Sequence, residues 1–504
     1  MRRLALLGAV LLALAVVAAF ALSTKPAPSQ PAVADGQVAA VTSVTRSCPP
    51  AAPGAGKTTH ISMIAVPSQT AAKGSAAAST GAATLSAVPA ASASPAATNP
   101  AKKAQKKTST KTASVSESAP AAPVTVSAPG TATTVTAPSA GDAAGTALAV
   151  TGQMAEGLEA EQATSAGMGL VSCSHPSSDM WFVGSGAPDV QLYLMNTGAL
   201  AASVNVNILT DTGQQNGLAN AITVAPDQVI EENISPFVRG AQAVAMEVQT
   251  SSGQVAASVW ESNGTDGAWV PQSAEPSTTL VIPGLTVASS AARLFVTVPG
   301  QTDARVKVVA YTPAGAFQQF ATVPVQASAG ATTPVTLSSL GASAAGLELT
   351  SNVPIVAGVL VAGTGIGSFA TAAAPVTEQG VVAGNPATAG LTIGLLLTAP
   401  GAAATASVSV ISADGTVTSP ASLQGLTVAA GRTLAVTVPR PPGRQPFSIV
   451  LTPGADSGPL YAARVVTTGS GGLSAPLVSL LPVQSALTEI TLPAAQNSYT
   501  AVLP

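Results

Sequence analysis

Charged residues are scarce in this sequence, with Lys, Arg, Asp and Glu making up 8% of its 504 residues. The net charge is −3, so no basic face is expected and a nucleic-acid partner is disfavoured. The chain has only two histidines and two cysteines, too few for chemistry that needs several such ligands. We therefore expect no metal, no cofactor and no catalytic site.

Recognisable catalytic motifs are also missing. No G-x-S-x-G sequence occurs, and a Ser–His pair would have to use His60 or His175. Ala55–Thr59 resembles the end of a phosphate-binding loop, but position 51 is Ala where that loop needs Gly, so no nucleotide partner is expected. Glu231 and Glu232 are adjacent and would point to opposite faces of a strand, which does not suit a pair of glycosidase carboxylates.

Aromatic residues are few, at 3%, whereas Gly and Pro are abundant among many Ala, Val, Ser and Thr residues. Charged helix-forming residues are scarce in the same sequence. This mixture favours short strands joined by turns over helices.

The N-terminus carries the one long apolar run. Arg2 and Arg3 precede Leu4–Leu22, which is close to the ~20 residues that span a bilayer. Residues 1–22 are predicted to be a transmembrane anchor or a signal peptide cleaved near Ala21. In both cases the bulk of the chain is extracellular, and the first partner is the membrane itself.

Cys48 and Cys173 are expected to form a disulfide, because an exported chain folds in an oxidising compartment. The alternative is a zinc site that also uses His60 and His175. Their spacing matches no common zinc module, so the disulfide is favoured.

The N-terminal third divides by composition. Residues 23–47 are predicted to be a polar tether, and residues 48–69 a strand segment that includes Cys48 and the alternating run Ile61–Val66. Residues 70–147 are rich in Ala, Ser, Thr and Pro, with lysines clustered at 102–111, and are predicted to be a low-complexity disordered insert.

An internal repeat of about 101 residues follows. Leu192–Leu194 recurs as Leu294–Val296 and as Leu395–Leu397, and several other segments keep the same offset. Each unit holds short runs rich in Val, Ile and Leu that are separated by Gly, Pro, Asp or Ser. The predicted fold is all-β, with three tandem or mutually packed immunoglobulin-like β-sandwich repeats. Their predicted ranges are 148–278, 279–377 and 378–472, and 473–504 is expected to add strands to the third unit or to pack across the array.

The tryptophans suggest a possible binding surface. Trp181 and Trp269 lie in the first unit and have no counterparts in the later ones. An exposed pair of such rings would form a platform for stacking a sugar. The alternative is that both rings pack in a core or between units, and their exposure distinguishes the two.

The arrangement resembles actinobacterial membrane-anchored extracellular proteins grouped as domain of unknown function 5719. The residues that carry the resemblance are Cys48-Pro49, Cys173, the stretch Asp179–Gly186 and the strand Leu192–Asn196 that follows. The resemblance implies an exported or anchored β-rich protein and transfers no activity.

Together these features predict a non-catalytic, membrane-tethered extracellular protein with a structural or protein-interaction role in the cell envelope. One alternative is a carbohydrate-binding module for a wall or capsular polysaccharide. Another is an accessory subunit of a membrane glycosyltransferase or secretion machine.

Overall fold

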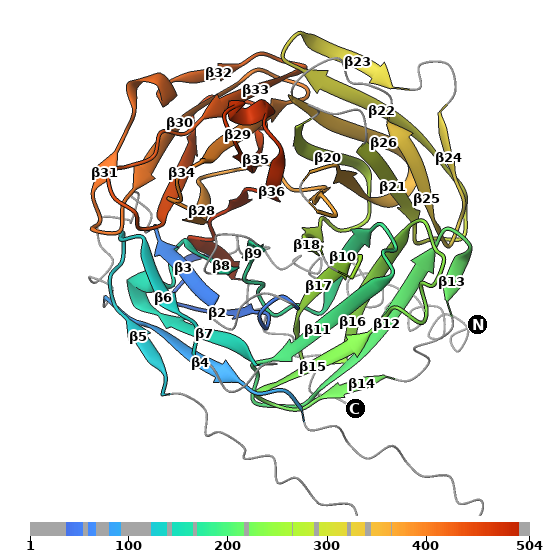
Figure 1. Ribbon diagram of the computed structural model, residues 1–504, viewed down its shortest axis with the longest axis horizontal. Coiled ribbons are helices and arrows are strands. Elements are labelled where there is room, and N and C mark those ends of the chain that lie inside the picture. The colour runs from blue at the N-terminus through green and yellow to red at the C-terminus, as the bar shows by residue number, and fades with distance from the viewer. Residues whose placement is uncertain are drawn as a thin grey trace, which may run out of the picture. The chain divides into compact units, whose positions relative to one another are not determined.

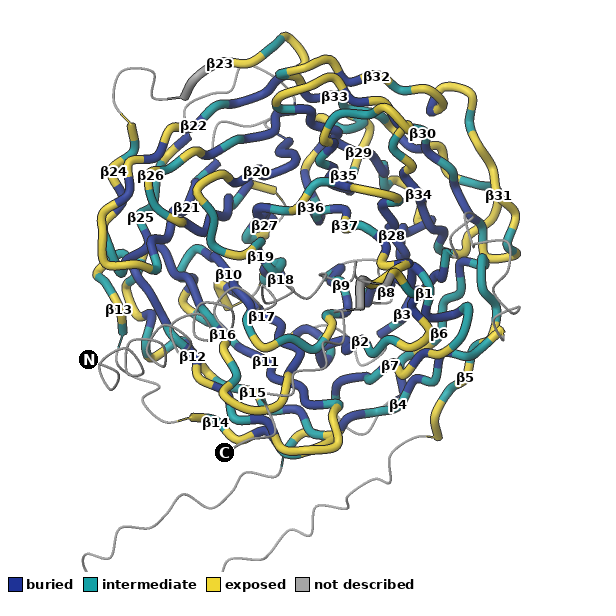
Figure 2. The backbone as a smooth tube through the Cα atoms, turned by 180° about the vertical axis from the view of Figure 1, so that it is seen from behind, coloured by how far each residue is buried: buried dark blue, intermediate teal, exposed yellow. Residues whose placement is uncertain are grey.

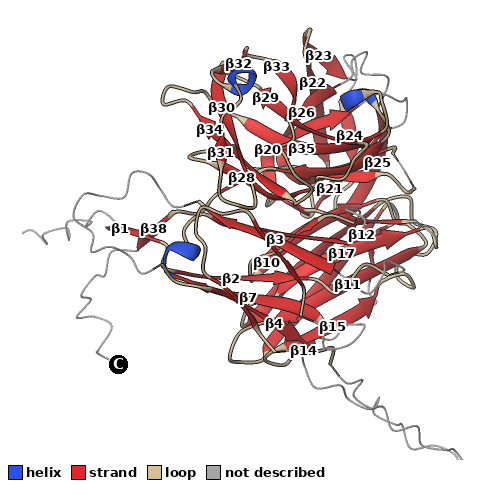
Figure 3. Cartoon of the chain, turned by 60° about the vertical axis from the view of Figure 1, so that its left-hand side comes forward, coloured by secondary structure: helices blue, strands red, loops and turns tan. Residues whose placement is uncertain are grey.

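The computed structural model describes residues 37–53, 59–66, 80–91, 122–138, 144–164, 169–215, 221–264, 266–286, 292–319, 324–337, 344–363 and 365–492. Their strands pair antiparallel into sheets, and helix occurs only as the short turns η1 (Gly152–Met154), η2 (Ala421–Leu423) and η3 (Gly472–Ser474) (Figure 3). The all-β prediction is confirmed. No helix in the described part is long and apolar enough to cross a membrane. The predicted segment 1–22 lies outside the described residues.

The first repeat distributes its strands over two sheets, ordered β13-β12-β16-β10-β19, with β14 paired to β12, and β15-β11-β17-β18. Its strands are β10 (Asp179–Gly184), β11 (Asp189–Asn196), β12 (Ala202–Thr210), β13 (Gly213–Gln215), β14 (Ile222–Val224), β15 (Gln228–Asn233), β16 (Val244–Ser252), β17 (Ala256–Ser262), β18 (Gly267–Val270) and β19 (Gln272–Ser273).

The second repeat has the same pattern, except that one long strand, β26, runs through both of its sheets. Its strands are β20 (Ser277–Thr286), β21 (Ala292–Val298), β22 (Ala304–Thr312), β23 (Gly315–Gln319), β24 (Val325–Ala327), β25 (Ala331–Leu337), β26 (Ala344–Val361) and β27 (Ser368–Thr371).

The third repeat is ordered β31-β30-β34-β28-β37 and β33-β29-β35-β36. Its strands are β28 (Gly380–Asn385), β29 (Leu391–Ala399), β30 (Ala404–Ile411), β31 (Val417–Thr418), β32 (Leu426–Val428), β33 (Arg432–Thr437), β34 (Phe447–Pro453), β35 (Tyr461–Thr468), β36 (Leu477–Pro482) and β37 (Gln484–Ser485). Thus β36 and β37, from the range 473–504, complete the sheets of this repeat.

A further unit of the same design precedes the repeats, and the sequence did not reveal it. Its sheets are ordered β2-β7-β4-β5 and β6-β3-β8-β9. The strands of this N-terminal unit are β2 (Ser43–Cys48), β3 (Thr59–Ala65), β4 (Ala83–Val88), β5 (Val124–Val126), β6 (Thr133–Thr136), β7 (Gly145–Thr151), β8 (Leu158–Thr164) and β9 (Val171–Ser172).

The predicted disordered insert 70–147 is therefore wrong for β4, β5, β6 and the start of β7. Composition misled because the strands are short and partly built from small residues, yet Ala83 and Leu85 are fully buried against strands distant in sequence. Residues 148–172, predicted to open the first repeat, belong to the N-terminal unit instead. Residues 92–121 lie outside the described part.

The strand pairing does not follow that of a constant-type immunoglobulin sandwich, so the predicted immunoglobulin-like form of the repeats is not confirmed. In that sandwich the first strand shares a sheet with the second, and the last shares a sheet with the sixth. In the first repeat β10 pairs with β16, and β17 pairs with β11. The first and last strands have exchanged sheets relative to that arrangement.

Within Val41–Thr488, which forms one compact unit, the sheets of the N-terminal unit and of the three repeats stand side by side in a ring, each sheet running from the centre to the rim (Figure 1). Strands such as β9, β18 and β36 lie near its centre, and β5, β14, β24 and β31 lie at its rim. Buried residues follow the middle strands and exposed residues follow the rim (Figure 2). Separate from this unit, β1 (Gln37–Ala40) pairs antiparallel with β38 (Glu489–Leu492).

Candidate functional site

Neither predicted platform tryptophan is available to a ligand. Trp181 is 2% exposed and packs between the first and second repeats, against Phe295 and Val356. Trp269 is 5% exposed and packs edge-on against Trp260, with ring centroids 5.1 Å apart. Of the two alternatives for Trp181 and Trp269, the glycan platform is therefore wrong, and the packing of both rings between sheets is confirmed.

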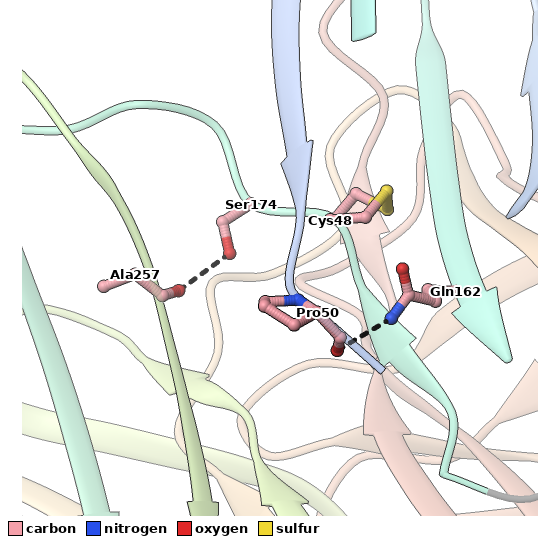
Figure 4. The surroundings of a disulfide bond; sticks show 6 residues. Cys48, Pro50, Gln162, Ser174 and Ala257 are labelled. Carbon is pink, nitrogen blue, oxygen red and sulfur yellow. Dashed lines mark hydrogen bonds between the residues drawn. A yellow bond between two sulfur atoms is a disulfide. The ribbon is translucent and has the colours of Figure 1, made fainter. Parts of the chain in front are cut away.

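The two cysteines form a disulfide, Cys48–Cys173, between residues 125 positions apart. Both are buried in the core of the N-terminal unit. Next to them, Ser174 donates its hydroxyl to the carbonyl of Ala257 in the first repeat, and the amide of Gln162 donates to the carbonyl of Pro50 (Figure 4). The bonded cysteines are not zinc ligands, and the disulfide lies inside one unit instead of joining two.

Close to this disulfide is a small pocket of about 40 Å³. Its walls come from the N-terminal unit, the first repeat and the third repeat. Pockets that bind drug-sized ligands usually have ~300 Å³ or more, whereas a water molecule needs roughly 10–15 Å³ by a comparable measure. The pocket therefore suits water and excludes a sugar or a nucleotide.

Three ionisable side chains meet at this pocket. Arg46 in β2 donates through Nη2 to Glu159 Oε1 at 3.0 Å and to the carbonyl of Leu158 at 3.1 Å. Arg46 Nη1 lies 3.4 Å from Nδ1 of His175. Burial raises the pKa of Glu159 to about 7 against the opposing effect of Arg46, and Glu161 adds to the rise. Desolvation, with a further effect of Arg46, lowers the pKa of His175.

A second buried ion pair continues this group toward the third repeat. Glu161 lies two residues from Glu159 on β8, hence on the same face of the strand. It accepts from Arg464 Nη1 at 2.7 Å. Arg464 lies in β35 and is fully buried. Gly384 in β28 leaves the room for this contact, because a Cβ there would come within 3.2 Å of Glu161.

A larger cleft lies between the first and second repeats, with a volume of about 520 Å³. Its polar lining includes Gln242, Asn263, Arg293 and Thr336. The guanidinium of Arg293 donates to the carbonyl of Gln242 at 2.9 Å and lies 5.3 Å from the ring centroid of Phe295. These contacts hold the positively charged guanidinium of Arg293 in a fixed position in the cleft.

One wall of this cleft is stiffened by a buried carboxylate. Glu261, which is fully buried, accepts from the backbone N–H of Ser185 at 3.1 Å and from the Ser185 hydroxyl at 2.6 Å. Burial raises the pKa of Glu261, while these bonds and the backbone N–H groups of Ala187 and Gly186 lower it. The wall at Ser185 thus has little freedom to move.

Sequence reasoning missed Arg46, Glu159, Glu161 and Arg464. A usable signal existed, because Leu158–Glu161 alternates apolar and polar residues, which would place both glutamates on one face of a strand. Arg464 interrupts the apolar run Ala462–Val466, which also marks an unusual core position. The partners of these residues come from distant units, so their pairing required the ring.

These features define a class, a ring of antiparallel β-sheets with one disulfide inside its N-terminal unit and an open cleft between the first and second repeats. The model of the family of unknown function DUF5719 matches residues 124–439, from β5 of the N-terminal unit to the end of the third repeat's β33. The chain belongs to this family. No curated protein matches the sequence.

Proposed function

We propose that this protein is a non-catalytic, extracellular interaction protein of the cell envelope, tethered to the membrane by residues 1–22. The observation that carries the proposal is the buried disulfide Cys48–Cys173. Disulfides of this kind form and persist in oxidising compartments outside the cytosol. The apolar run that begins the chain supplies the route of export, and the alternative of cleavage near Ala21 would yield a secreted protein.

We further propose that the four units descend from one immunoglobulin-like sandwich by duplication. The shared strand order of the three repeats and the N-terminal unit supports this. Such a ring is a rigid scaffold whose loops and junctions can bind partners.

The cleft between the first and second repeats is the proposed binding surface, and a protein is the proposed partner. Its volume of about 520 Å³ lies within the range of ligand-sized pockets, and its lining mixes Leu360 and Pro334 with the polar groups around Arg293. Arginine and apolar side chains together are typical of protein interfaces.

Site-specific photo-cross-linking in intact cells tests this proposal. The cross-linker replaces Gln242, which lines the cleft, or Gln326, an exposed glutamine of β24 that does not line it. We expect an adduct with an envelope protein from position 242 only, and its loss in Arg293→Gln but not in Arg305→Gln, an exposed arginine of the same repeat.

The other outcomes separate the remaining functions. Equal adducts from both positions, or none from position 242, would contradict the protein-binding cleft. An adduct that contains polysaccharide without protein would support carbohydrate binding. A glycosyltransferase or a secretion component in the adduct would identify an accessory subunit.

A further inference from the structure

The ring has one junction that the chain does not cross within the compact unit. The N-terminal unit, the first repeat, the second repeat and the third repeat follow one another along the chain, whereas the third repeat meets the N-terminal unit without a connecting segment (Figure 1). We call this last junction the seam. It is closed by backbone bonds, including Val41 N–H to the carbonyl of Thr488 at 2.9 Å and Gly157 N–H to the carbonyl of Leu487 at 3.0 Å.

Both apolar and charged contacts hold the seam. The apolar part is a small cluster in which Ile64 and Ala132 of the N-terminal unit pack against residues that include Val381 and Val450 of the third repeat. The charged part is the buried Glu161–Arg464 pair. Burying two charges costs desolvation, so such a pair adds little net stability compared with well-packed apolar residues.

The seam also covers Glu159. The pocket beside this carboxyl is lined by Arg46 and His175, by first-repeat residues that include Trp269, and by Leu481, Pro482 and Gln484 of the third repeat. Separation of the third repeat from the N-terminal unit would therefore remove one wall of the pocket and expose Glu159 to bulk solvent. A carboxyl group is more easily ionised in bulk water than in a closed interface.

We propose that the ring opens at the seam, and that the buried glutamate Glu159 makes this opening more frequent as the pH rises. The charged groups that face Glu159 are Arg46 from β2, Glu161 from β8 and His175 from the segment after β9. Arg464 of the third repeat donates to Glu161, and Glu161 in turn lies beside Glu159 on the same face of β8. Because His175 touches Arg46, it must be tested separately.

The direction follows from linkage. Burial in the closed ring raises the pKa of Glu159 from its usual 4.5 to about 7, so the closed ring binds a proton that the open ring releases. The closed state is favoured at low pH and loses this advantage as the pH rises toward 7. If opening returns Glu159 to its usual pKa, the opening constant rises about tenfold between pH 6 and pH 8.

Hydrogen exchange followed by mass spectrometry on the full-length protein in detergent measures this opening. Exchange is corrected for the intrinsic rate at each pH and compared between peptides from β8 and β28, which meet at the seam, and peptides from β10 and β21 at the junction of the first and second repeats. We expect the roughly tenfold rise only in the seam peptides. Equal changes at both junctions would mean that the ring unfolds as a whole, and would overturn the proposal.

Two variants assign the effect. Glu159→Gln keeps the shape of the protonated side chain and should make seam opening independent of pH, while His175→Gln should leave the pH dependence in place. A third, Arg464→Met, should raise seam exchange at both pH values without affecting the reference junction. If the pH dependence survives Glu159→Gln, or disappears in His175→Gln, the assignment to Glu159 is wrong.

Discussion

Two junctions of the ring use equivalent glycines in different ways. Gly284 lies in the first strand of the second repeat, β20, and Gly384 lies in the first strand of the third, β28, at matching positions of the sequence repeat. A Cβ at Gly284 would lie 2.5 Å from the Cβ of Leu396 in the third repeat, and one at Gly384 would lie 3.2 Å from the Cβ of Glu161 in the N-terminal unit. In both cases the missing glycine side chain leaves room for a residue of the neighbouring unit. At Gly284 that residue is the uncharged Leu396, and at Gly384 it is Glu161, which carries a carboxyl group.

The difference depends on the residue at one matching strand position of each repeat, which is Arg464 in the third and Val359 in the second. Arg464 pairs in register with Leu395, and the matching residue of the second repeat, Val359, pairs with Leu294. Arginine is long enough to reach past Gly384 to the neighbouring unit, whereas Val359 stays in its own core. A charged contact of this kind therefore requires two particular residues in separate units, Arg464 in the third repeat and Glu161 in the N-terminal unit.

We expect the largest loss of stability from removal of the disulfide, which lies in the N-terminal unit, on one side of the seam. A crosslink between residues 125 positions apart contributes about 4–5 kcal/mol in the chain-entropy model. The double variant Cys48→Ser, Cys173→Ser should lose roughly that amount, measured by denaturant unfolding of the full chain. A loss below about 1 kcal/mol would show that the N-terminal unit is held mainly by its neighbours.

Removal of one member of the seam's ion pair should rank next. Glu161→Ala leaves the fully buried Arg464 guanidinium without its carboxylate, and such changes cost about 3–5 kcal/mol. Denaturant unfolding again measures the loss. The conservative Arg464→Lys serves as a comparison, and a neutral result for Glu161→Ala would mean that water already solvates the arginine.

The uncharged junction should respond to lost packing. Leu396 is fully buried against the second repeat, so Leu396→Ala should destabilise the protein by about 3 kcal/mol. The same change at the exposed Leu200 is the matched control, since that side chain is 78% exposed and should lose little. Equal losses at the two positions would contradict the described packing.

The smallest effect is expected when the charged junction is converted into an uncharged one. Arg464→Met combined with Glu161→Met removes both charges and keeps apolar volume, and such replacements are often neutral or stabilising. We expect a change within about 1 kcal/mol of the parent by denaturant unfolding. A loss as large as that of Glu161→Ala would show that the charges themselves hold the seam.

The sequence predicted much of the fold and little of the site. Strand runs such as Leu192–Leu194 and their recurrence identify the β-rich repeats, because alternation and turn residues are local signals. The N-terminal unit escaped notice because Ala83–Val88 and Thr133–Thr136 pair with strands distant in sequence, and composition does not reveal such pairing. The sequence left the tryptophans open between a platform and packed positions, because their exposure depends on the junctions between sheets, which the sequence of a single unit does not reveal.

The hydrogen bond between Val41 and Thr488 places the entry and the exit of the ring side by side. In such a ring the chain can begin at any unit without a change in which units are neighbours in space. A short linker from Thr488 to Val41, with new ends in the segment 374–378 between the second and third repeats, should give a circular permutant that folds to the same ring. In that permutant the seam would be covalent and the junction of the second and third repeats would become the one without a connecting chain.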